Sequence, residues 1–172
     1  MSLPDAFLTT PITHRALHGT GIPENSLAAV RAAVAAGYGI EVDIQPSADG
    51  VAMVFHDDTL DRLTGETGPV ATRTADELGR IALTGGYEGI PTLSEVLETV
   101  GGQVPVLIEI KDQDGAMGTD VGPLERAVAD ALKGYTGPVA VMSFNPHAVA
   151  AMAELAPDVP RGLTTCAWDS DE

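Results

Sequence analysis

Apolar strand-like runs alternate with helical patterns along this chain, and that alternation limits its fold more than any other feature. Short aliphatic runs begin at six places, namely Pro11, Ile40, Val51, Val104, Val139 and Gly162. Segments with apolar residues at helical spacing lie between most of them. Because alternating strands and helices favour a mostly parallel sheet covered by helices, we expect an α/β fold.

Residues that begin helices support this division of the chain. A helix is expected over 25–36, with Asn25 or Ser26 as its cap. Thr74 and Thr92 each stand three residues before a glutamate, which is the pattern of a capping box. Further helices are expected over 93–100, over 124–132 and from Pro146.

Two architectures accommodate this order of elements. The Asp49-Gly50 turn predicts that the second and third strands form a pair, and the aperiodic segment 57–73 is interpreted as an elaborated loop. A doubly wound sheet needs no more strands than the six found. A (β/α)8 barrel needs about eight strands and about 250 residues, against 172 residues here. The pattern alone leaves both architectures open.

An excess of acidic residues narrows the range of partners. The chain has 9 lysines and arginines against 25 aspartates and glutamates, a net charge of −16. Nucleic acids and anionic membrane surfaces require an exposed basic face, so we expect neither as a partner. No segment approaches the roughly 20 apolar residues of a membrane-spanning helix, so we expect no stable membrane insertion.

The single cysteine and the two ends bear on localisation. Cys166 cannot form an internal disulfide, which suits a reducing compartment. We therefore expect a cytoplasmic protein, or a periplasmic one if a signal peptide has been removed. Residues 1–10 are interpreted as an N-terminal extension in which 1–3 are a cloning scar, and residues 169–172 as a solvated acidic tail.

Charged and polar residues gather where the predicted strands end. His14 and Arg15 follow the first strand, and His56 follows the third. Glu41 and Asp43 stand two residues apart in the second strand. Since side chains alternate across a strand, these two carboxylates share one face and the aliphatic residues beside them share the other.

The fourth strand repeats this arrangement, with Glu109 and Lys111 on one face. Taken singly, such residues are more often a solvated face of a sheet, and a lone histidine is more often a partly buried packing residue. If each residue had only that ordinary role, four consecutive strands would have polar residues at the same end by coincidence. We therefore predict one clustered site at the carboxyl ends of parallel strands, where a divalent cation such as Mg²⁺ or Ca²⁺ offsets the cost of burying carboxylates.

Six short motifs carry a more specific signal. They are His14-Arg15, Pro23-Glu24-Asn25-Ser26, Glu41-x-Asp43, His56-Asp57-Asp58, Ile90-Pro91-Thr92-Leu93 and Glu109-x-Lys111. In this order and spacing the chain resembles the glycerophosphodiester phosphodiesterases, from about Pro11 to Phe144 and more weakly to Gly162. The resemblance implies a (β/α)8 barrel, one bound Mg²⁺ or Ca²⁺, and hydrolysis of glycerophosphodiesters to glycerol 3-phosphate and an alcohol.

The resemblance also implies roles for the matched residues. The implied metal ligands are Glu41, Asp43 and Glu109, with Glu24 as a further candidate. The implied acid–base pair is His14 and His56, and the implied phosphate contacts are Arg15 and Lys111. One histidine would take a proton from water or from the substrate's glycerol hydroxyl, and the other would protonate the leaving alkoxide. Three carboxylates, two cations and a phosphodiester of about one negative charge sum to about −2, which a divalent cation neutralises.

The chain departs from the family pattern in two places. The family usually has glycine after the His-Arg pair, where this chain has Ala16, and a left-handed backbone there would be strained. The family barrel also continues with two more strands beyond those found here, so the domain at 11–172 is expected to be an incomplete barrel with open edges. A fragment of a longer chain or a homo-oligomer would each explain that gap.

Two rival functions share most of this site. A lysophospholipase D-like phosphodiesterase would need an apolar groove for an acyl chain, and the sequence has no cluster of aromatic residues to supply one. A truncated barrel that binds phosphate esters without turning them over is the non-enzymatic alternative. A comparison of glycerophosphocholine with lysophosphatidylcholine as substrates tests the first alternative, and metal-dependent release of glycerol 3-phosphate would exclude the second.

Overall fold

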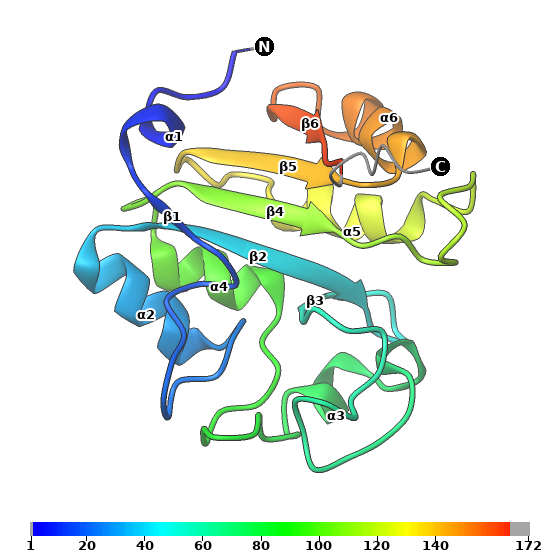
Figure 1. Ribbon diagram of the computed structural model, residues 1–172. Helices are drawn as coiled ribbons and strands as arrows, with labels where there is room; N and C mark the ends of the chain where they lie inside the picture. Colours follow the sequence, from blue (N-terminus) through cyan, green and yellow to red (C-terminus); the bar gives the residue numbers. More distant parts are fainter. Residues whose placement is uncertain (1, 166–172) are drawn as a thin grey trace, which may run out of the picture.

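A computed structural model describes residues 2–165 and shows one mixed sheet with helices packed on one face (Figure 1). Met1, Cys166 and the acidic tail at 169–172 lie outside the described residues. The strands are β1 (Ile12–Thr13), β2 (Gly39–Pro46), β3 (Ala52–Val54), β4 (Val106–Ile110), β5 (Val139–Ser143) and β6 (Arg161–Leu163). All six predicted strands are thus confirmed.

The sheet is parallel except for one hairpin. Its strands follow the order β1-β2-β4-β5-β6, and β3 pairs with β2 in antiparallel fashion. The pair turns at Gly50, whose φ of 80° lies in the left-handed region that glycine adopts without strain. Within residues 2–165 the sheet does not close, because β1 and β6 remain its edges. This agrees with the expected incomplete barrel.

The helices predicted from capping residues and apolar spacing are all present. They are α1 (Ala6–Thr9), α2 (Leu27–Ala36), α3 (Ala75–Leu78), α4 (Leu93–Val100), α5 (Pro123–Ala131) and α6 (Pro146–Leu155), with a 3-10 turn at Val70–Thr72. The Ser26 hydroxyl accepts from the Ala29 N–H at the start of α2, and both capping boxes, at Thr74 and Thr92, are formed. The four-residue α1 carries no such signal and was not predicted. No helix among the described residues is long and apolar enough to cross a membrane.

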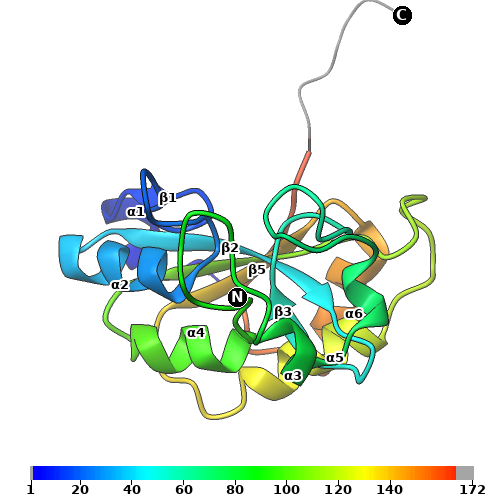
Figure 2. The same cartoon turned by 90° about the horizontal axis from the view of Figure 1, so that it is seen from below.

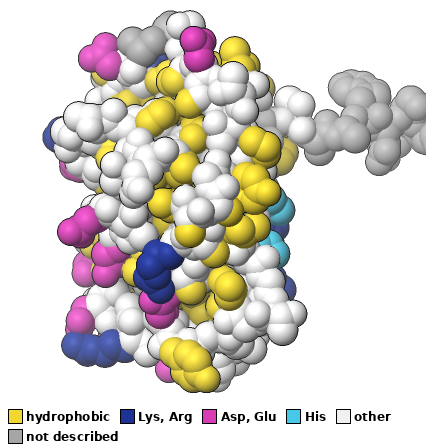
Figure 3. Space-filling model, turned by 90° about the vertical axis from the view of Figure 1, so that its left-hand side faces the viewer, with side chains coloured by type: hydrophobic (Ala, Val, Ile, Leu, Met, Phe, Trp, Pro, Cys, Tyr) yellow, Lys and Arg dark blue, Asp and Glu magenta, His cyan; other side chains and the backbone are white. Residues whose placement is uncertain are grey.

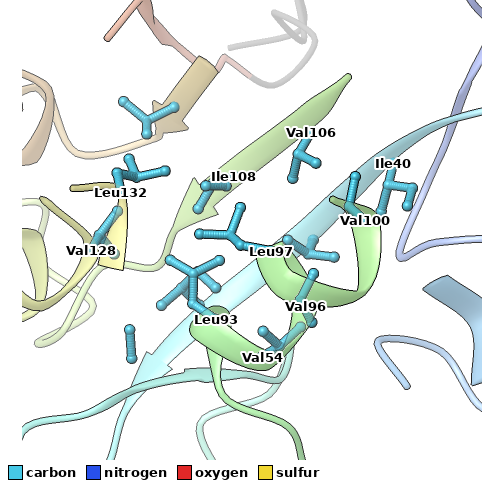
Figure 4. Packing of buried hydrophobic residues seen from close by; sticks show 14 of the residues in the cluster. Ile40, Val54, Leu93, Val96, Leu97, Val100, Val106, Ile108, Val128 and Leu132 are labelled. Carbon is cyan, nitrogen blue, oxygen red and sulfur yellow. The ribbon is translucent and has the colours of Figure 1, made fainter. Parts of the chain in front are cut away.

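One hydrophobic core joins the sheet to its helices. The aliphatic face of β2 and β4, including Ile40 and Ile108, is fully buried. It packs against Leu97 and Val100 of α4, as Figure 4 shows. Seen from below, the larger helices lie together under the sheet (Figure 2). Because α2, α4, α5 and α6 all contribute to this one core, the arrangement is that of a barrel wall rather than of a doubly wound sheet.

A second, smaller core lies beneath the segment predicted to be an elaborated loop. It is built around Phe55, Leu60 and Leu78, all fully buried, together with buried aliphatic residues as far along the chain as Ile90. The loop that follows β3 is therefore folded on apolar contacts of its own, without a regular helix or strand of more than a few residues.

The face of the sheet opposite the helices is partly uncovered. A groove of about 440 Å³ runs along β5 and β6 and is lined by Leu3, Leu107, Met142 and Leu163 among others. Leu163 on the edge strand is 54% exposed. Figure 3 shows another side of the molecule, the left-hand side of Figure 1, where hydrophobic side chains form a band and most charged side chains lie on one flank. The expectation of an open apolar edge is met in the described part of the chain.

Leu97 provides a test of the main core. Leu97→Ala removes a side chain that is 4% exposed and packs between sheet and helix. Loss of its buried surface and the resulting cavity should lower the free energy of unfolding by about 2–5 kcal/mol. Urea denaturation measures the change. Leu8→Ala, at a side chain that is 74% exposed, is the control and should cost less than about 0.5 kcal/mol; equal losses in the two variants would contradict the described core.

Candidate active site

Three buried carboxylates converge on the face of the sheet opposite the helices. β2 and β4 are adjacent parallel strands, and their register sets Asp43 directly beside Glu109. Glu41 lies two residues before Asp43 and so points to the same face. Each of the three offers an oxygen within 4.8 Å of the others, and their exposed fractions are only 5%, 1% and 7% for Glu41, Asp43 and Glu109. The predicted cluster is present.

Glu41 shows the electrostatic cost of this convergence. Burial, and then the negative charge of Asp43, raise the pKa of Glu41 to about 7. Its Oε2 accepts a hydrogen bond from the backbone N–H of Arg15 at 2.9 Å, whereas its Oε1 is buried without a partner among the described residues. A buried carboxylate oxygen without a hydrogen-bond partner, in a residue grouped with two further carboxylates, suits a divalent cation, which prefers oxygen ligands.

Two cationic side chains lie against the carboxylates. The Lys111 ammonium is 2.7 Å from Asp43 Oδ1 and also contacts Glu109 Oε1. Burial lowers the pKa of Lys111, but its hydrogen bonds to these two carboxylates outweigh that effect and leave the pKa raised. Arg15 Nε stands 3.7 Å from Asp43 Oδ2. Both residues predicted to contact phosphate are therefore in the same cluster as the predicted metal ligands.

The loop after β1 reaches the cluster through an uncommon backbone conformation. Arg15 and Ala16 have φ values of 55° and 63°, so both residues have a left-handed backbone. This is the conformation considered for Ala16 because the family usually has glycine at that position. The strained Ala16 is held by a hydrogen bond from its N–H to the Glu41 carbonyl at 3.0 Å. The strain is thus tied directly to the strand that carries two of the carboxylates.

Asn25 is a site residue that sequence reasoning assigned only to a helix cap. Its Nδ2 donates to Asp43 Oδ2 at 2.9 Å, and its side chain is fully buried. Ser26, not Asn25, caps α2. Asn25 has a φ of 56°, a conformation that asparagine adopts more readily than most residues. Apart from that cap prediction, Asn25 appeared in the sequence analysis only as part of the Pro23-Glu24-Asn25-Ser26 motif.

Glu24 lies outside the group of three carboxylates. Its Oε1 is 2.8 Å from Arg15 Nη1 and 2.8 Å from Arg62 Nη2. Burial raises its pKa, but hydrogen bonds from Arg62 and Arg15 outweigh that and hold the pKa of Glu24 below its usual value. In this structure its carboxylate is engaged by two guanidinium groups, and its part in metal binding stays a prediction.

The two histidines stand in different surroundings. His14 is exposed in the turn that follows β1. His56 follows Phe55, whose N–H donates to the Asp43 carbonyl at 2.9 Å, so the backbone just before His56 is bound to the strand that carries Glu41 and Asp43. The His56 Nδ1 is 2.7 Å from Asp57 Oδ1. Their acid–base role stays a prediction.

Asp57 and Arg62 form an ion pair that no sequence pattern predicts, although Asp57 belongs to the matched His56-Asp57-Asp58 motif. Arg62 Nε and Nη2 donate to the two oxygens of Asp57 at 2.7 and 2.8 Å. The hydrogen bonds from Arg62 lower the pKa of Asp57 to about 2. Burial acts in the opposite direction, and the hydrogen bond with His56 adds to the lowering. Arg62 lies in the aperiodic loop, where no spacing rule indicates which partner an arginine will reach.

The fold and the site together define a class of protein: an α/β barrel wall of mostly parallel strands that carries three clustered carboxylates of the kind that hold a metal ion. Comparison with known proteins is consistent with that class. Residues 14–172 match the glycerophosphoryl diester phosphodiesterase family, and the chain belongs to this family.

Individual relatives agree with the family assignment. The chain is 34% identical over 165 residues to a glycerophosphodiester phosphodiesterase of Caldanaerobacter subterraneus, covering 90% of this chain and 66% of that protein. It is 30% identical over 156 residues to human glycerophosphodiester phosphodiesterase 1, covering 85% of this chain and 46% of the human protein. The chain thus spans just under two thirds of the bacterial relative and about half of the human one.

Solved structures show the same architecture. An Oleispira antarctica phosphodiesterase, determined in complex with its product sn-glycerol-3-phosphate, superposes with a TM-score of 0.83 and 30% identity, over 96% of this chain and 70% of that one. A glycerophosphodiester phosphodiesterase of Agrobacterium tumefaciens gives a TM-score of 0.75 and 31% identity, over 89% of this chain and 65% of that one.

The low pKa of Asp57 predicts a pH-dependent contribution to stability. A folded-state pKa of about 2, below the ordinary 3.8, means that the ionised form stabilises the fold above pH 3.8 and that this contribution is lost as the pH falls towards 2. Allowing for solvent screening, Asp57→Asn should cost on the order of 1 kcal/mol at pH 6, and the difference from wild type should shrink between pH 5 and pH 3.

Urea denaturation across that range measures the effect. Asp58→Asn, at the exposed neighbouring carboxylate, is the matched control and should differ from wild type by less than about 0.5 kcal/mol at every pH. A difference between wild type and Asp57→Asn that does not change with pH would show that the ion pair with Arg62 is absent in solution.

Proposed function

We propose that this protein hydrolyses glycerophosphodiesters to glycerol 3-phosphate and an alcohol with the help of one bound divalent cation. The observation that carries the proposal is the convergence of Glu41, Asp43 and Glu109 beside Arg15 and Lys111. Family membership supports it, because the relatives are named glycerophosphodiester phosphodiesterases. The Oleispira relative's complex with sn-glycerol-3-phosphate supports the identity of the phosphate product.

The donor set fits a hard divalent cation. Glu41, Asp43 and Glu109 would hold the ion. Among the described residues Oε1 of Glu41 has no hydrogen-bond partner, so a bound cation would offset the cost of burying it. Mg²⁺ and Ca²⁺ both prefer such oxygen ligands, with substrate and water oxygens completing the shell. When bound, the ion would supply Lewis-acid stabilisation of charge on phosphorus-bound oxygens.

Besides the metal ion, the positive charges that would face an anionic substrate are the side chains of Arg15 and Lys111. Both are largely buried and lie against the carboxylates. In the proposed complex they bind the non-bridging phosphate oxygens, since a guanidinium and an ammonium both donate hydrogen bonds to phosphate. Positive groups fixed in a buried site stabilise the charge that grows on these oxygens during the reaction.

The proposed proton transfers use His14 and His56. One takes a proton from the nucleophile as its oxygen bonds to phosphorus, and the other gives a proton to the leaving alkoxide as that phosphorus–oxygen bond breaks. Attack by water gives glycerol 3-phosphate directly, whereas attack by the substrate's glycerol hydroxyl gives a cyclic phosphate that water then opens by the same proton transfers. Asp57 occupies Nδ1 of His56, which directs the other ring nitrogen, Nε2, to proton transfer. Histidine suits either task because its ordinary pKa of about 6.5 makes both forms accessible near neutral pH.

The metal scheme predicts a specific loss of turnover. Glu41→Gln and Glu109→Gln each remove a charged ligand, so divalent-dependent release of glycerol 3-phosphate from glycerophosphocholine should fall below about 1% of wild type. Isothermal titration with Mg²⁺ and Ca²⁺ should show weakened binding in parallel. Glu98→Gln, at an exposed carboxylate on α4, should behave as wild type. Full activity of either ligand variant in excess chelator would overturn the scheme.

The same assay separates the rival functions. Lysophosphatidylcholine as the better substrate would favour a lysophospholipase D-like enzyme. Binding of glycerophosphocholine with no release of product at any concentration of either cation would indicate a phosphate-ester-binding domain. Among residues 2–165 the large exposed aromatic residues, Tyr38, Tyr87 and Phe144, do not together line a pocket, but the apolar groove along β5 and β6 makes the comparison of the two substrates necessary.

The acid–base scheme makes a separate prediction. His14→Ala and His56→Ala should each reduce kcat roughly 10²–10⁴-fold, because each removes one proton-transfer partner. Circular dichroism should show an unchanged fold, and Mg²⁺ binding should persist. His147→Ala, at an exposed histidine on α6, is the control. A histidine variant that turns over at the wild-type rate would have no proton-transfer role.

A further inference from the structure

Arg62 connects two loops that reach the site from different strands. It belongs to the loop after β3, and its guanidinium contacts a carboxylate of that loop, Asp57, and a carboxylate of the loop after β1, Glu24. Nη1 and Nη2 donate to the two oxygens of Glu24 at 3.2 and 2.8 Å, and Nε and Nη2 donate to Asp57 at 2.7 and 2.8 Å. One side chain thus makes a two-point contact with each loop.

Each of these carboxylates also contacts a residue with a proposed function. Asp57 Oδ1 is 2.7 Å from His56 Nδ1, and Glu24 Oε1 is 2.8 Å from Arg15 Nη1. The contacts form a continuous chain from His56 to Arg15 with Arg62 at its centre. The Arg62 side chain is 46% exposed, so surface ion pairing alone would contribute little to stability. Its two-point geometry restricts orientation far more than a single ion pair does.

The contact with Asp57 also selects a tautomer of His56. An ionised carboxylate only accepts hydrogen bonds, so Nδ1 must carry the proton in the bond to Asp57. Arg62 occupies both oxygens of Asp57 and so fixes the plane of the carboxylate that His56 meets. If Arg62 is removed, Asp57 is free to rotate, and the Nδ1–H form of His56 loses its preference.

We propose that Arg62 is a positioning residue that couples the loops after β1 and β3, holding the His56 tautomer through Asp57 and the Arg15 guanidinium through Glu24. The proposal rests on the proposed phosphodiesterase function for its effect on turnover. Its structural part, the control of the His56 tautomer, stands on the contacts alone.

The test compares Arg62→Gln with Arg73→Gln in the full 172-residue chain. Arg73 lies in the same segment of chain and pairs with the exposed Glu66 at 3.0 Å, away from the site. Arg73→Gln therefore removes the same charge as Arg62→Gln without changing a contact of the site. Nitrogen-15 NMR of the imidazole ring, assigned by the signal missing in His56→Ala, should show mostly the Nδ1–H tautomer of neutral His56 in wild type and in Arg73→Gln. Arg62→Gln should show a mixture of both tautomers.

Turnover supplies the second measurement. Arg62→Gln should lower kcat/KM for glycerophosphocholine about 10–100-fold, as expected when catalytic groups lose their alignment, while Arg73→Gln stays near wild type. Arg62→Lys should restore less than half of the loss, because an ammonium cannot make both two-point contacts. Adding Asp57→Asn to Arg62→Gln should cause little further loss, since both changes break the same connection.

The outcomes separate the two proposals. A wild-type His56 tautomer in Arg62→Gln overturns the role of Arg62 whatever the turnover. If Arg62→Gln does not fold, Arg62→Lys and Asp57→Ala give the same NMR comparison, and an unchanged tautomer in both overturns it equally. A tautomer shift in a protein whose wild type releases no glycerol 3-phosphate would support the contact with Arg62 and overturn the phosphodiesterase function.

Discussion

Mutual repulsion among three buried carboxylates is the interaction on which the rest of this structure depends. Two adjacent parallel strands place Glu41, Asp43 and Glu109 within reach of one ion, and burial makes their charges costly, as the raised pKa of Glu41 shows. The aliphatic face of the same strands offsets that cost by packing against four helices. Lys111 and the Arg15 loop neutralise part of the charge. The cluster of carboxylates thus lies on strands whose other face is held by the main hydrophobic core.

Features that depend on local sequence were predictable. The six strands, the hairpin at Gly50 and both threonine capping boxes follow from periodicity and end signals within a few residues. The alternation of side chains correctly placed Glu41 with Asp43 and Glu109 with Lys111 on one face of the sheet. The choice of a barrel wall over a doubly wound sheet came from the family motifs, because strand counting left both architectures open.

The rest depended on contacts between residues far apart in sequence. Asn25 bonds Asp43 across 18 residues, and Arg62 bonds Glu24 across 38. No periodic pattern specifies either contact: Asn25 also suits a helix cap, and Arg62 lies in an aperiodic loop. The partners of Glu24 could not be read from its motif, because they are set by how two loops fold over the sheet. The left-handed backbone at Ala16 was foreseeable only from the glycine usual at that place in the family.

The small core beneath the loop after β3 has a consequence for how this molecule moves. Phe55, Leu60, Leu78 and Ile90 belong to a cluster separate from the one that joins the sheet to its helices. Regions with separate apolar contacts open as separate cooperative units, each with its own free energy of opening. The segment bearing His56 and Arg62 can therefore loosen and re-form while the carboxylate-bearing strands keep their amide hydrogens protected from exchange. The loop that bears His56 and Arg62 and the strands that bear the three carboxylates thus depend on different parts of the hydrophobic interior.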